Sequence, residues 1–120
     1  MEDFVSFEIA KKLKEKGFSL EKTEIYGKFD SDGLFHSQLY FNYIETMDCD
    51  EIIAPTISQV LKWLRKEKKI HICVDFDGDM NWYYQIAIYG STDIAADGYG
   101  YNDYEISALA GIEYVLDNLI

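Results

Sequence analysis

The sequence predicts an α+β fold: three helices and a four-stranded antiparallel sheet made of two hairpins, in the order α-β-β-α-β-β-α. Apolar residues recur every three or four positions in three segments, which is typical of amphipathic helices. In the other segments they alternate along strands that meet at Asp-Gly turns. With 120 residues, 48% of them hydrophobic, the chain can bury its own core, so we expect a single domain spanning residues 1–120.

The first helix is expected over Ser6–Lys16, because Ile9 and Leu13 fall on one stripe while charged residues face away. Gly17 suits the left-handed cap that ends such a helix.

A first hairpin follows, with strands Glu24–Phe29 and Leu34–Tyr43 joined by a turn at Asp30–Gly33. The segment Ile44–Ala54 is rich in acids and is expected to be a connection.

A second helix is expected to start after Pro55, within the segment Ala54–Lys69. Thr56 and Gln59 form a capping box, and Pro55 just before it suits the entry to a helix. One helix face carries four cations that we expect to be solvated or paired within the chain, namely Lys62, Arg65, Lys66 and Lys69.

A second hairpin joins Lys69–Phe76 to Trp82–Tyr89 through a turn at Asp77 and Gly78. The segment Gly90–Asp103 shows no periodicity and is expected to be a loop.

The final helix is expected over Asp103–Leu119, with Asn102 as N-cap and Glu105 completing the box. Its core stripe is expected to be Ile106, Leu109, Ile112, Leu116 and Leu119.

Three aspartates alternate as the first ligands of a calcium loop do, namely Asp75, Asp77 and Asp79. An EF-hand loop also needs Gly at its sixth position and Glu at its twelfth, where this chain has Met80 and Ile86. We therefore expect a turn here, and no metal.

One alternative is a metal-dependent small enzyme that uses His36, His71, Cys73 and Asp75. Side chains two residues apart on a strand are about 6.6 Å apart, too far for a hydrogen bond between a cysteine nucleophile and a histidine base. The sequence also contains no nucleotide-binding or catalytic motif. It therefore predicts no catalytic residue, no enzyme activity and no cofactor.

The two cysteines, Cys49 and Cys73, are too few for a disulfide framework and fit free thiols in a reducing compartment. The first residues place two acids before the apolar ones, unlike a secretory signal, and no apolar run is long enough to span a membrane. We therefore expect a cytoplasmic protein.

Charge is unevenly distributed along the chain. The net charge is −11, and residues 70–120 hold nine of the 22 acids and none of the 11 Lys and Arg residues. A field of one sign repels nucleic acid and membrane surfaces and attracts basic ones. We expect a basic protein partner, no direct nucleic acid and no membrane; the alternative is that the acids serve solubility alone.

Seven of the ten tyrosines lie in the same region, residues 70–120. Tyrosine gives large, stiff contact area with one polar tip, which protein interfaces favour, although strand tyrosines can also simply cover a sheet. The residues expected to contact a partner are Asp75, Asp77, Asp79, Asp93, Asp97, Tyr99, Tyr101, Asp103, Tyr104 and Glu105. A further alternative is a structural or assembly module, such as a homodimer that pairs exposed sheet faces.

Two stretches, "APTISQVLKWLRKEKKIHICV" and "YNDYEISALAGIEYVLDNL", resemble helices of small uncharacterised proteins from phages and mobile elements of Bacteroidetes-type bacteria. The layout is also similar to phage helix–sheet–helix sandwich domains. The resemblance covers residues 54–120 and includes no chemical residue, so no catalytic role carries over. Ile106 and Ser107 depart from the family pattern, which prefers an acid and then an alanine or glutamate.

The resemblance implies a small acidic phage or mobile-element protein that acts by binding a host protein. Together with the charge distribution, it leads us to expect an inhibitor of a basic nucleic-acid-handling host protein. An anti-CRISPR protein that blocks a CRISPR nuclease is one such inhibitor.

Overall fold

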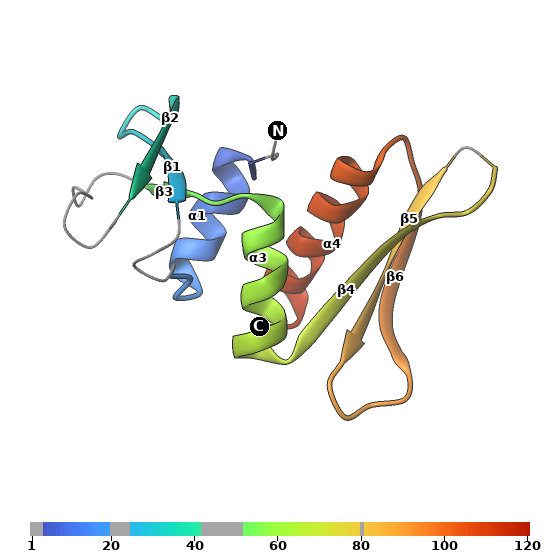
Figure 1. Cartoon of the computed structure of the whole chain (residues 1–120). Coiled ribbons are helices and arrows are strands. Elements are labelled where there is room, and N and C mark those ends of the chain that lie inside the picture. The colour runs from blue at the N-terminus through green and yellow to red at the C-terminus, as the bar shows by residue number, and fades with distance from the viewer. Residues whose placement is uncertain (1–3, 20–24, 42–51, 80) are drawn as a thin grey trace. The chain divides into compact units, whose positions relative to one another are not determined.

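The computed structural model describes residues 4–19, 25–41, 52–79 and 81–120. The chain divides into two compact units, Met1–Gln59 and Val60–Ile120, and each is described by itself. In the described residues there are three helices and two three-stranded antiparallel sheets, in the order α-β-β-β-α-β-β-β-α (Figure 1). The α+β class is confirmed. The prediction of a single four-stranded sheet was wrong, because the two hairpins belong to separate sheets and each sheet contains a third strand.

Helix α1 (Phe7–Glu15) begins the first unit much as expected. The Ser6 side chain caps it by accepting a hydrogen bond from the Ile9 N–H, 3.3 Å away. Gly17 takes a left-handed φ of 82° just after the helix, and Phe18 N–H donates to the Leu13 carbonyl. These bonds satisfy backbone groups that a helix end leaves open.

The first sheet has the strand order β2-β1-β3. Strands β1 (Ile25–Phe29) and β2 (Phe35–Phe41) form the expected hairpin, and Gly33 has a φ of 81° in its turn. Strand β3 (Ile52–Ala54) lies inside the segment expected to be a connection. It is a strand because β1 offers a free edge, against which Phe29 registers with Ile52. A strand of three residues is too short to show the alternation of apolar and polar residues by which a strand is predicted from sequence. The rest of the expected connection and Cys49 lie outside the described residues.

Helix α3 (Ile57–Trp63) starts at the expected capping box, which is confirmed. Gln59 N–H donates to Thr56 Oγ1 at 3.2 Å, and Thr56 N–H donates to Gln59 Oε1 at 2.9 Å. The chain continues as a π-helical segment, η1 (Leu64–Lys68), and leaves it at Lys69, whose φ is 59°. The helix expected after Pro55 is therefore present to Lys68, but its last five residues are wound as a π-helix, and Ala54 belongs to β3.

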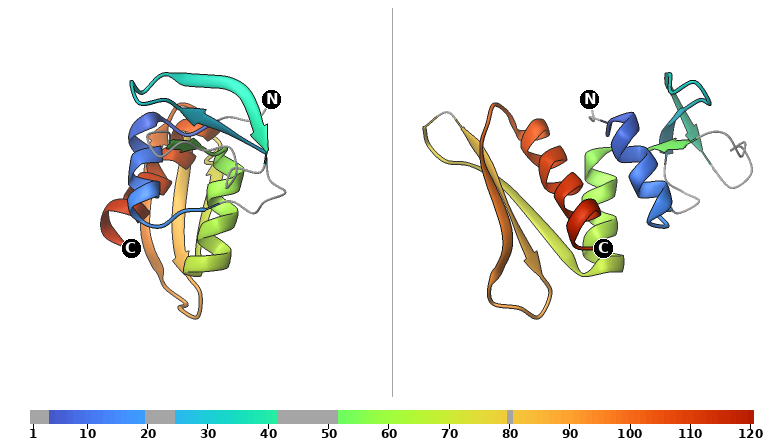
Figure 2. Two further views of the ribbon diagram at one scale, coloured as in Figure 1. Left: turned by 90° about the vertical axis from the view of Figure 1, so that its left-hand side faces the viewer. Right: turned by 180° about the vertical axis from the view of Figure 1, so that it is seen from behind.

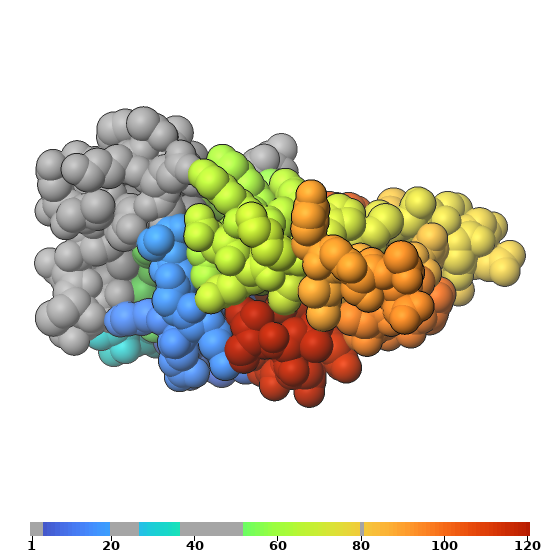
Figure 3. Space-filling view, turned by 90° about the horizontal axis from the view of Figure 1, so that it is seen from below, coloured from blue at the N-terminus to red at the C-terminus, as the bar shows by residue number. Residues whose placement is uncertain are grey.

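The second sheet has the strand order β4-β5-β6. Strands β4 (Ile70–Phe76) and β5 (Trp82–Ile88) pair in full register, and the turn between them is confirmed. Tyr89 N–H, just after β5, donates to the Lys69 carbonyl at 2.8 Å. Seen from below, the lime-green end of α3 and η1 therefore lies next to the orange β5–β6 turn (Figure 3).

Strand β6 (Ile94–Tyr101) lies where a loop was expected. Its alanines and glycines have low strand propensity, so the sequence shows no strand pattern there. Packing against β5 explains why this segment is a strand. Gly98 lies opposite Tyr84 of β5, and a Cβ at Gly98 would lie 2.7 Å from Tyr84 Cζ. The glycine leaves the space that the tyrosine ring fills.

Helix α4 (Tyr104–Asn118) covers one face of the second sheet (Figure 2). Asp103 is its N-cap, accepting from the Ile106 N–H at 2.7 Å, so the expected cap at Asn102 was wrong. The core stripe is also shifted from the expected one. Its buried residues are Ser107, Ala108, Gly111, Ile112, Val115 and Leu116.

Small side chains explain this shift. Ile106 is 46% exposed, while Gly111 sits so close to the sheet that a Cβ there would lie 3.0 Å from Ile72 Cγ2. The helix therefore buries the face whose small residues let its backbone approach the sheet, rather than the face that includes the larger apolar side chain of Ile106. This packing buries the Ser107 hydroxyl, which has no hydrogen-bond partner among the residues that the structure describes.

None of the described helices is both long and apolar enough to cross a membrane.

Candidate interaction surface

The face of β4-β5-β6 turned away from α4 carries the polar residues of these strands, and we call it the open face. The register of the three strands determines its membership. It comprises His71, Cys73 and Asp75 of β4, Tyr83, Gln85 and Ala87 of β5, and Asp97, Tyr99 and the exposed apolar Ile94 of β6.

Two tyrosines stack at the centre of the open face. The rings of Tyr83 and Tyr99 lie 5.3 Å apart with an interplanar angle of 23°. The Tyr99 hydroxyl donates to Asp97 Oδ2 at 3.4 Å, and Asp75 registers directly opposite Tyr83. The pair is therefore bordered by a carboxylate on each side.

The acids beside Tyr83 perturb it electrostatically. Partial burial raises the pKa of the Tyr83 phenol, and the negative charges of Asp75 and Asp77 and the neighbouring Cys73 raise it further. The tyrosine therefore stays neutral and able to donate a hydrogen bond. A cation brought close would interact with both the ring face and the acids.

The β4–β5 turn extends the acidic surface beyond the strands. Asp77 Oδ1 accepts hydrogen bonds from the Asp79 N–H at 2.8 Å and the Asn81 N–H at 3.4 Å, and Gly78 takes a φ of 90°. One oxygen of Asp77 is thus committed to the turn. The exposed carboxylate of Asp79 accepts no hydrogen bond from a described residue.

The structure brings together only part of the expected contact set. Asp75, Asp97 and Tyr99 share the open face, and Asp77 and Asp79 adjoin it in the turn.

The other five residues of that set lie elsewhere. Asp93 is in the β5–β6 turn, at the opposite end of the sheet from Asp77. Tyr101 registers with Trp82 on the face that α4 covers. Asp103 caps α4, Tyr104 packs edge-on against Trp82, and Glu105 belongs to the first turn of that helix.

Tyr83 was not selected from the sequence, although it lies at the centre of the open face. The strand alternation identified its face, but its partner Tyr99 was in a segment expected to be a loop. The stack between them depends on β6, which the sequence did not reveal.

The acids of the open face lack cationic partners within the described part of the chain. No Lys or Arg nitrogen there lies within 4.0 Å of a carboxylate oxygen of Asp75, Asp77 or Asp97. The lysines of the middle helix thus do not neutralise them by direct pairing.

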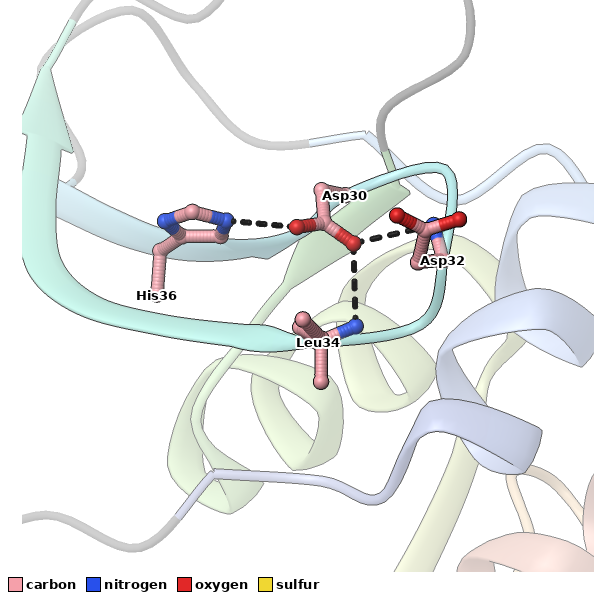
Figure 4. Close-up of polar contacts among 4 residues, drawn as sticks. All are labelled: Asp30, Asp32, Leu34 and His36. Carbon is pink, nitrogen blue, oxygen red and sulfur yellow. Dashed lines mark hydrogen bonds and ion pairs between the residues drawn. The ribbon is translucent and has the colours of Figure 1, made fainter.

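A separate polar cluster lies in the β1–β2 turn of the first unit (Figure 4). Asp30 accepts hydrogen bonds from the N–H groups of Asp32 and Leu34 and lies 3.0 Å from His36 Nε2. The hydrogen bond from His36, followed by the one from Leu34, holds the pKa of the Asp30 carboxyl below its usual value. The contact with Asp30 therefore holds the His36 side chain against the β1–β2 turn.

The residues of the enzyme alternative are divided between the units, with His36 in the first and His71, Cys73 and Asp75 in the second. In the described ranges, no three His, Cys, Asp or Glu side chains are grouped so that they could hold a metal ion. The absence of enzyme activity stays a prediction.

No family model matches this chain, and neither a curated protein nor a solved structure does.

Proposed function

We propose that this protein binds a basic surface of a nucleic-acid-handling protein through the open face, and thereby keeps nucleic acid from that surface. The observation that carries the proposal is the combination of stacked tyrosines with exposed carboxylates at Asp75 and Asp97, which pair with no Lys or Arg of the described residues. Lysine and arginine side chains are the groups that such a surface attracts.

The geometry suits competition with a phosphate backbone. Asp75 of β4 and Asp97 of β6 lie on the two outer strands, two strand spacings or about 10 Å apart across the sheet, so negative charge stands on both sides of the tyrosine pair. Tyrosine rings supply the stacking that nucleobases would otherwise offer to arginine. The action requires no catalytic residue.

The resemblance to phage and mobile-element proteins suggests which partner to assay first. Inhibition of a CRISPR nuclease would protect such an element from its host. We therefore choose RNA-guided nucleases as the first panel.

The test is cleavage of a DNA target by each nuclease with increasing amounts of this protein, at several salt concentrations. We expect inhibition that weakens steeply as salt rises, because the Debye length shortens from about 10 Å at 0.1 M to about 3 Å at 1 M. Asp75→Asn and Asp97→Asn should each weaken inhibition about 2- to 5-fold, the range for an exposed ion pair.

The matched control is Glu113→Gln, which removes the same charge from α4, on the other side of the sheet. It should leave inhibition close to the parent value. Inhibition that is insensitive to salt, or that falls equally in all three variants, would contradict a role for the open face.

A further inference from the structure

A hollow of about 440 Å³ lies at the end of the second sheet remote from the acidic turn. Residues from η1, β4, β5 and the β5–β6 turn line it, so it lies wholly within the second unit. The lining includes Arg65, Lys69, His71, Ala87, Tyr89 and Ser91. Its volume falls within the range of small-molecule sites.

The charge of this hollow is opposite to that of its surroundings. Its lining contains two cations and no carboxylate, although the chain carries a net charge of −11. Arg65 is exposed and lies within 4.0 Å of no carboxylate oxygen in the described part of the chain. Lys69 Nζ donates one hydrogen bond to the Lys66 carbonyl, which leaves two donors available.

The backbone holds Lys69 in an unusual conformation at this site. Its φ of 59° makes it the one non-glycine residue with positive φ in the described chain, a conformation that costs a residue with a Cβ. The Lys69 carbonyl also accepts a hydrogen bond from the Tyr89 N–H. Lys69 caps the end of η1 in this conformation, which glycine would adopt without strain, so a lysine here carries a conformational cost.

A hydroxyl completes the set of donors. Ser91 Oγ accepts a hydrogen bond from the Asp93 N–H at 3.2 Å, so its proton remains free to donate. The lining beside these donors includes the apolar Ala87 and Ile88, and the largely exposed Tyr89 also contributes to it. The hollow therefore combines anion donors with an apolar wall.

We propose that this hollow binds a small organic phosphate, with the phosphate at Arg65, Lys69 and Ser91 and a flat apolar body against Ala87 and Tyr89. An arginine fork, an ammonium and a hydroxyl together match the oxygens of a phosphate. Of the acids of the open face, Asp75 is remote from the hollow: at about 3.3 Å per residue it lies about 13 Å from His71, beyond the Debye length of about 8 Å at physiological salt. Asp97 registers with Gln85, about 6.6 Å along β5 from Ala87, so its charge opposes the phosphate and the attraction of the two cations must exceed that repulsion.

The test is a titration of the isotope-labelled protein with phenyl phosphate, inorganic phosphate and phenol, followed by the backbone amide signals. We expect saturable shifts at His71, Ala87 and Ser91 with phenyl phosphate. Inorganic phosphate should bind at least about ten-fold more weakly, and phenol should produce no saturable shift. Equal affinity for the two phosphates would overturn the apolar part of the proposal.

The variant Lys69→Gly separates binding from folding. Because glycine accepts the left-handed backbone, this variant should be as thermally stable as the parent or more so. It should bind phenyl phosphate at least about ten-fold more weakly. Lys62→Gln, which removes a cation outside the hollow, should bind as the parent does. Unchanged affinity in Lys69→Gly, or an equal loss in Lys62→Gln, would overturn the proposal.

Discussion

Replacing Gly98 by alanine tests whether the Tyr84 ring holds the second sheet together. Tyr84 is 5% exposed and lies between two glycines, Gly98 of β6 and Gly111 of α4. A Cβ at Gly98 would lie 2.7 Å from Tyr84 Cζ and 2.9 Å from its Oη, well inside contact distance. The ring has no room on its other side, where a Cβ at Gly111 would already lie 3.2 Å from Tyr84 Cδ1.

The expected cost combines two opposing effects. Overpacking of a buried contact costs about 1–3 kcal/mol, and replacing a strand glycine by alanine returns about 0.5–1 kcal/mol of chain entropy. The net loss in the free energy of unfolding should be about 1 kcal/mol, and at most about 2.5 kcal/mol. With a urea m value of about 1 kcal/mol/M, the midpoint should fall by about 1 M.

Tryptophan fluorescence is a suitable assay, because both tryptophans, Trp63 and Trp82, belong to the second unit. The control is the same Gly98→Ala change in a Tyr84→Leu background, where the ring is gone and the cost should shrink by at least about 1 kcal/mol. An equal cost in both backgrounds, or a stabilisation by Gly98→Ala alone, would refute the reasoning.

Two further predictions concern Ser107 and Asp30. The buried Ser107 hydroxyl has no described hydrogen-bond partner, so Ser107→Ala should raise the free energy of unfolding by about 1 kcal/mol in the same urea assay; a loss would mean that the hydroxyl is bonded. Because the pKa of Asp30 is lowered on folding, the stabilisation is present above its unfolded value of 3.8 and is lost as pH falls through the folded value. Carboxyl NMR should show Asp30 titrating below 3.8, and His36→Ala should raise that pKa; an unchanged titration would exclude the hydrogen bond as its main cause.

Local signals in the chain predicted most of the elements correctly. Helix α1, the β1–β2 hairpin, the capping box of α3 and the β4–β5 hairpin all depend on residues close together in sequence, such as Thr56 with Gln59. Hydrogen bonds of this kind form within one turn, so spacing alone reveals them.

The candidate surface was predicted only in part, for the same reason. Asp75 and Asp77 followed from the hairpin, but Tyr83 could not be chosen over other tyrosines without knowing that β6 lies beside it. The cap of α4 differed by one residue, Asp103 instead of Asn102, because both residue types suit an N-cap equally.

The sequence by itself determined the α+β class, the turns, the uneven charge and the buried faces of β4 and β5, since these follow from composition and short-range periodicity. Only the tertiary structure decided that β3 and β6 are strands, that α4 turns Ser107 and Gly111 inward, and that Arg65 and Lys69 meet at one hollow. These features depend on contacts between residues far apart in the chain. A glycine such as Gly98 shows its role only beside the ring that it accommodates.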